Sequence, residues 1–113
     1  MKPAYLLLIP AALLAAPAAA APDNRTAEAN AAFTVYPAES VRNNEQGIVH
    51  YRVRIDRMGR VNRCEVLQSS GHRRLDYATC GLLLDQARFT PMRDEKGRAT
   101  RSTFDGRVHW RLS

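Results

Sequence analysis

The sequence predicts an α+β domain: a small three-stranded antiparallel sheet with a short N-terminal helix and one main helix packed on one face. Residues 49–56 alternate strictly between apolar and polar, and residues 104–112 do so apart from Gly106; both patterns are typical of strands with one buried face. Between them, residues 75–89 carry apolar side chains at helical spacing. A sheet covered on one face by helix gives both patterns a place to bury their apolar side.

The first alternating stretch and the segment after it predict a β-hairpin. In GIVHYRVRID every second residue from Val49 on is apolar, and the residues between are polar or charged. DRMGR then predicts a tight turn, in which Gly59 can take a positive φ. The return strand VNRCEVLQ places Cys64 and Val66 on its apolar face.

The other elements follow in order along the chain. Pro37 suits the start of a short helix over 38–43. In the main helix, Asp76 lies in the first turn, where the helix dipole favours an acidic side chain. Residues 90–101 are expected to form a polar loop before the last strand.

The N-terminus predicts an exported protein. Residues 1–20 combine a basic start at Lys2, an apolar run and an A-x-A site, which is the layout of a cleavable secretory signal peptide. An uncleaved membrane anchor is the alternative, although prolines interrupt the alanine-rich run. Residues 21–34 are expected to be a mobile leader and residues 35–113 the folded domain.

The chain has two cysteines, Cys64 and Cys80, and a disulfide between them is the favoured interpretation. Periodicity places both on buried faces, and export places them in an oxidising compartment. A structural zinc site would need four ligands, and His50 and His109 are predicted on the opposite face of the sheet. A Cys–His nucleophile using His72 would need an exposed thiolate. Two free buried thiols are the other alternative.

The formal net charge is +6, and the outward sheet face collects much of it. This basic face is predicted to comprise Arg52, Arg54, Arg63, Arg107 and Arg111. Such a face could meet anionic lipid or lipopolysaccharide, with only peripheral membrane contact if the signal is cleaved. Nucleic acid is not expected, because the aromatic residues alternate onto the buried face. No motif of an enzyme, metal site or cofactor site is recognised, so no enzymatic function is predicted.

Several motifs together resemble the C-terminal domain of TonB, the energy transducer of the Gram-negative periplasm. YPAES, GIVHYRVRIDRMGRV, SSGHRRLD, ARFTPMRDEKG and a final VHWRL occur in the family's order between Tyr36 and Leu112. The resemblance implies a periplasmic module that binds an extended segment of an outer-membrane transporter, which is added as a strand to the sheet edge.

The resemblance also implies where the partner binds. The open edge would be the last strand, with the Tyr-Pro segment near the partner. The expected partner-binding residues are Tyr36, Pro37, Thr103, Phe104, Asp105, Arg107 and His109. TonB itself has an uncleaved anchor and a long Pro-rich spacer, so we expect this chain to act as a free binding module. Its partner would be a transporter segment, another periplasmic protein, or a second copy in a self-associating homodimer.

Overall fold

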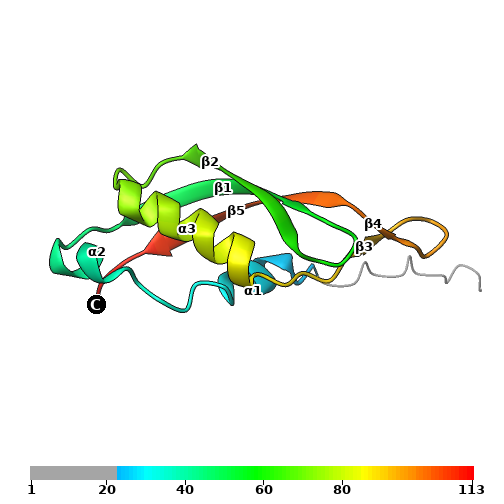
Figure 1. Ribbon diagram of the computed structural model, residues 1–113, viewed down its shortest axis with the longest axis horizontal. Coiled ribbons are helices and arrows are strands. Elements are labelled where there is room, and N and C mark those ends of the chain that lie inside the picture. The colour runs from blue at the N-terminus through cyan, green and yellow to red at the C-terminus, as the bar shows by residue number, and fades with distance from the viewer. Residues whose placement is uncertain (1–22) are drawn as a thin grey trace, which may run out of the picture.

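The computed structural model describes residues 23–113, so the predicted signal peptide lies outside the described residues. Within them the chain forms three helices and five strands (Figure 1). In order these are α1 (Arg25–Asn30), α2 (Ala38–Arg42), β1 (Gly47–Ile55), β2 (Val61–Gln68), α3 (Arg73–Gln86), β3 (Met92–Arg93), β4 (Ala99–Thr100) and β5 (Ser102–Trp110). None of the described helices is long and apolar enough to cross a membrane.

The main sheet has three antiparallel strands in the order β2-β1-β5, which confirms the predicted α+β fold. The central strand β1 pairs Val53 with Cys64 on one side and with Phe104 on the other. Residues on the same face of neighbouring strands therefore lie side by side, as in any antiparallel ladder. The strand β5 has one paired side, toward β1, and one open side.

The core lies on one face of this sheet, beneath α3 and α1 (Figure 1). Strand β1 supplies much of it, because its alternate residues from Val49 to Ile55 are at most 1% exposed. Trp110 closes one end of the core and donates a hydrogen bond from Nε1 to Thr79 Oγ1 at 2.9 Å. The buried indole N–H is therefore satisfied within the core.

Helix α3 ends three residues earlier than the periodicity predicts. Ala87 leaves helical geometry with φ −67° and ψ 136°. The next residues turn toward the β1–β2 hairpin, where the Phe89 N–H donates to the Gly59 carbonyl at 2.8 Å. Gly59 has φ +85°, as predicted for the tight turn. Pairing with the hairpin thus competes successfully with the last helical turn.

The predicted disulfide is confirmed. Cys64 on β2 and Cys80 on α3 are bonded, with their Cα atoms 5.5 Å apart. The bond links the main helix covalently to the outer strand of the sheet. His72 lies at the N-terminus of α3 and takes no part in it.

Two segments differ from the expectation. The segment predicted as a mobile leader forms α1 in its described part, and Ala29 and Ala32 are buried in the core. Small alanine side chains let a helix approach the sheet closely without adding a long apolar stripe to the sequence. The segment predicted as a polar loop contains the short β3–β4 hairpin, whose turn places Gly97 at φ +80°.

Candidate functional site: the open edge of β5

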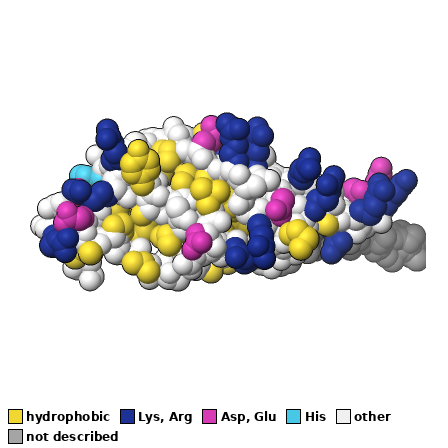
Figure 2. Space-filling model, viewed as in Figure 1, with side chains coloured by type: hydrophobic (Ala, Val, Ile, Leu, Met, Phe, Trp, Pro, Cys, Tyr) yellow, Lys and Arg dark blue, Asp and Glu magenta, His cyan; other side chains and the backbone are white. Residues whose placement is uncertain are grey.

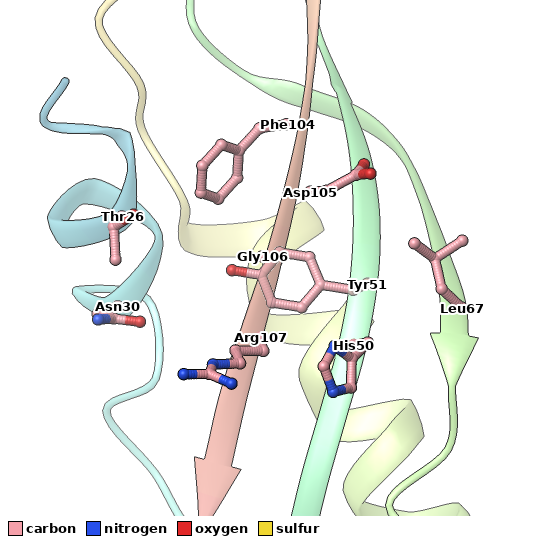
Figure 3. Close-up of a pocket in the computed structure, with 9 residues that line it drawn as sticks. All are labelled: Thr26, Asn30, His50, Tyr51, Leu67, Phe104, Asp105, Gly106 and Arg107. Carbon is pink, nitrogen blue, oxygen red and sulfur yellow. The ribbon is translucent and has the colours of Figure 1, made fainter.

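The direction of the β5 backbone groups follows from two hydrogen bonds. Arg25 of α1 donates from Nη1 to the Thr103 carbonyl at 3.2 Å. Helix α1 lies on the side of β5 away from β1 (Figure 3), so Thr103 directs its backbone groups to the open edge. The Leu112 N–H donates in the opposite direction, to Gln46 Oε1 just before β1, at 2.7 Å. Odd-numbered residues of β5 therefore direct their backbone groups to the open edge, and even-numbered residues direct theirs to β1.

Backbone groups of every second residue in an antiparallel strand point the same way. Asp105, Arg107 and His109 therefore direct their N–H and C=O groups to the open edge, as Thr103 does. Beyond the strand ladders, no other described residue forms a hydrogen bond with the backbone of these three. Four of the predicted partner-binding residues are thus gathered along one unpaired edge.

Helix α1 is held by side-chain contacts beside the Thr103 end of this edge. The Arg25 guanidinium lies over the Phe104 ring, 5.3 Å from its centroid, and forms an ion pair with Asp23 at 2.9 Å. The hydrogen bonds from Arg25 lower the pKa of Asp23 to about 2. Glu28 accepts hydrogen bonds from the N–H and hydroxyl of Thr90 at 2.9 and 2.6 Å. These contacts hold the first turn of the helix.

A hollow of about 570 Å³ lies between α1 and β5 and continues onto the sheet (Figure 3). Its lining is Thr26, Asn30, His50, Tyr51, Leu67, Phe104, Asp105, Gly106 and Arg107. The Tyr51 ring reaches from β1 beneath Gly106, where an added Cβ would lie 2.5 Å from the Tyr51 hydroxyl oxygen. Burial raises the pKa of Tyr51 to about 12, so this hydroxyl keeps its proton at neutral pH.

The Tyr-Pro segment lies beside the His109 end of the same edge. The Tyr36 ring packs edge-on against Trp110 with centroids 5.1 Å apart, and its hydroxyl donates to the Glu45 carbonyl. Pro37 directly precedes α2. A second hollow, of about 320 Å³, is lined by residues 33–36 and 108–111. The structure therefore brings Tyr36 and His109 together, whereas Pro37 lies outside both hollows.

The predicted basic face is only partly free of acidic partners. Arg52 forms two hydrogen bonds with Asp105 across the β1–β5 ladder, at 2.7 and 2.8 Å. Arg54 lies directly opposite Arg63 in the β1–β2 ladder. Within residues 23–113, no ion pair involves Arg54, Arg63, Arg107 or Arg111. Figure 2 shows the other side of the molecule, which carries α3 and further scattered Lys and Arg side chains.

Sequence reasoning missed several residues of this site, among them Arg25, Tyr51 and Gly106. Nothing in the sequence marked Arg25 or Tyr51 as a site residue. Arg25 lies in the segment expected to be a leader, and Tyr51 is one of the alternating apolar residues expected in the core. Gly106 did carry a signal in the sequence, since a glycine inside a strand often marks the close approach of another group. No group of three or more His, Cys, Asp or Glu side chains suited to a metal occurs in the described part of the chain.

Comparison with known proteins agrees with this geometry. The family model described as the Gram-negative bacterial TonB protein C-terminal matches residues 34–112. No curated protein matches the chain. The matched family belongs to the Gram-negative envelope and acts in TonB-related transport through contacts with other proteins. Since the match covers most of the 113 residues, the chain belongs to the TonB C-terminal domain family.

Proposed function

We propose that this chain is a periplasmic, non-enzymatic binding module that adds an extended segment of a partner to the β5 edge. The partner class is the exposed segment of an outer-membrane transporter. The observation that supports it is the row of outward backbone groups at Asp105, Arg107 and His109, beside two hollows. Strand addition uses the backbone groups for affinity and the hollows for choice of side chains.

The structure limits the length of the added strand. At Thr103 the outward carbonyl already accepts from Arg25, so pairing is available from Asp105 to His109. An added strand of about five or six residues, the usual strand length, matches this interval. Each new backbone hydrogen bond contributes about 1 kcal/mol net, and ordering the peptide opposes part of that gain. The N–H and C=O groups of three outward residues offer at most six such bonds, about 6 kcal/mol before that cost, so we expect weak binding, with a Kd of tens of micromolar or above.

Replacing Arg107 by proline tests the edge. Arg107→Pro removes one outward N–H, and an edge strand tolerates the lost donor because it bonds no neighbouring strand of the fold. The matched control, Arg107→Ala, removes the same side chain and keeps the N–H. Binding of a fluorescent peptide from the N-terminal segment of a transporter of the same genome is followed by anisotropy. We expect Arg107→Pro to weaken binding at least tenfold and Arg107→Ala less than about threefold, since one exposed side chain contributes little.

Unchanged binding by Arg107→Pro, with circular dichroism showing an intact fold, would contradict strand addition at this edge. Equal losses in both variants would assign the binding to the arginine side chain instead. Sedimentation of the protein alone adds a check on self-association. Dimers that Arg107→Pro dissociates would show that the same edge also pairs with a second copy.

Contact with an anionic lipid surface is the second candidate. It is favoured by one observation: Arg54 and Arg63 lie opposite each other, and like charges in that position destabilise a sheet unless an anion lies between them. Binding to vesicles with and without anionic lipid, at two salt concentrations, distinguishes it. Attraction to a charged surface falls steeply with salt, whereas backbone pairing changes little.

A further inference from the structure

Gly106 leaves a gap on the inner face of β5. The inner side chains of this strand alternate with its exposed ones, and Phe104 and Val108 flank the glycine on the inner face. The Tyr51 hydroxyl and the Phe104 ring come within 2.5 and 2.8 Å of the position that a Cβ on Gly106 would take, so this hydroxyl lies directly against the strand. In Figure 3 the Tyr51 hydroxyl points past Gly106 toward α1.

Uncharged polar groups surround this gap. The hydroxyls of Tyr51 and Thr26 and the side-chain amide of Asn30 line the same hollow. None of the three side chains forms a hydrogen bond with another residue in 23–113. The charged neighbours on α1 are occupied elsewhere, Arg25 by Asp23 and Glu28 by Thr90. The inner part of the hollow therefore offers free donors and acceptors without a free charge, because Arg107, which forms no ion pair within residues 23–113, lies on the outer face of β5.

We propose that this hollow is a side-chain pocket that accepts glutamine or asparagine from the partner strand, at the residue opposite Gly106. The inference rests on strand addition at the β5 edge. Residues directly opposite each other in a sheet project to the same face. The partner side chain opposite Gly106 thus enters the hollow between β5 and α1, next to the Tyr51 hydroxyl.

The chemistry of the lining selects the amide class. A primary amide both donates and accepts, so it can accept from the protonated Tyr51 hydroxyl and pair with the Asn30 amide. An aliphatic side chain of similar size would cover these groups and leave them without partners. A carboxylate on this inner face would lose its hydration with no unpaired cation beside it, since the unpaired Arg107 side chain lies on the outer face of β5.

A positional scan tests the pocket in whichever register the peptide pairs with β5. The probe is a labelled nine-residue peptide of alternating threonine and valine, in which each position in turn carries glutamine, leucine or glutamate. Affinity is measured by anisotropy for the wild type and for Tyr51→Phe, which removes only the hydroxyl. The matched control is Tyr77→Phe, because Tyr77 lies on α3 and is 72% exposed.

We expect glutamine to exceed leucine and glutamate by about fivefold at one position, the effect of one neutral hydrogen bond. The two adjacent positions should show no gain, since their side chains project to the other face. Tyr51→Phe should abolish the preference, because the glutamine peptide loses a hydrogen bond and the leucine peptide no longer covers an unpaired hydroxyl, whereas Tyr77→Phe should keep the preference. Asn30→Ala should reduce it as well.

The possible outcomes distinguish a failure of the pocket inference from a failure of strand addition at the β5 edge. If peptides bind, and Arg107→Pro prevents it, but no position prefers glutamine, then the pocket inference is overturned and strand addition stands. A glutamine preference that persists in Tyr51→Phe also overturns the assignment of the pocket. If no peptide of the scan binds to the wild type, both the proposed function and the pocket fail together.

Discussion

Removing the disulfide should cost this domain a large part of its stability. The perturbation is the double substitution Cys64→Ala and Cys80→Ala, which deletes the link between β2 and α3. The bond joins residues 16 positions apart. For a loop of that length, loss of chain entropy in the unfolded state corresponds to about 3 kcal/mol. Small domains have total stabilities of about 5–15 kcal/mol, so this is a substantial fraction.

The assay is thermal unfolding followed by circular dichroism, with and without a thiol reductant. For a domain of this size each kcal/mol shifts the midpoint by about 4–8 °C, so we expect a decrease of at least about 12 °C. Reductant should lower the wild type to a similar midpoint and leave the double variant unchanged. A wild type that loses less than about 4 °C on complete reduction would refute the reasoning, because the fold would then not depend on the loop closure.

Two further predictions concern a turn and a carboxylate. Gly59→Ala should destabilise more than Gly97→Ala in urea unfolding: both glycines have positive φ, which costs about 1–2 kcal/mol for alanine, but a Cβ at Gly59 would also lie 2.0 Å from the Phe89 carbonyl oxygen. Equal losses would show that the Phe89 contact is easily relieved. Burial alone would raise the pKa of Asp76, but hydrogen bonds from two serine hydroxyls and a backbone N–H just before α3 outweigh it, so the pKa falls below its usual 3.8. This stabilisation is present above pH 3.8 and is lost as pH falls through the folded-state pKa. Asp76→Asn should therefore lower the unfolding midpoint at pH 7 and shrink the difference from wild type near pH 2; a difference independent of pH would contradict it.

The strands could be predicted because their signal is local. β1 and β5 each bury one face along their length, so the alternation in the sequence is the alternation in the structure. The disulfide was predictable for the same reason, since periodicity alone placed Cys64 and Cys80 on facing surfaces. The C-terminal limit of α3 was not, because it depends on a hydrogen bond from Phe89 to a hairpin far away in sequence.

Helix α1 could not be predicted, because its contacts are long-range and its residues are small. Ala29 is fully buried, yet the alanines in and just after this helix are too small to give a clear periodic signal. Arg25 reaches the backbone of Thr103, 78 positions later in the chain. The contact of Tyr51 with Gly106 likewise depends on the register of β1 against β5, which no single strand pattern contains.

The position of α1 also bears on how such a site can select its partner. The family match begins at residue 34, whereas the outer wall of the hollow is formed by Thr26 and Asn30, which precede it. The β5 edge can pair with any extended backbone, because main-chain hydrogen bonds do not depend on side-chain identity. Discrimination must then come from what lines the space beside the edge, and here α1 supplies part of that lining. A change of residues in α1 could therefore alter the partner preference while the sheet, its edge and the family pattern all stay the same.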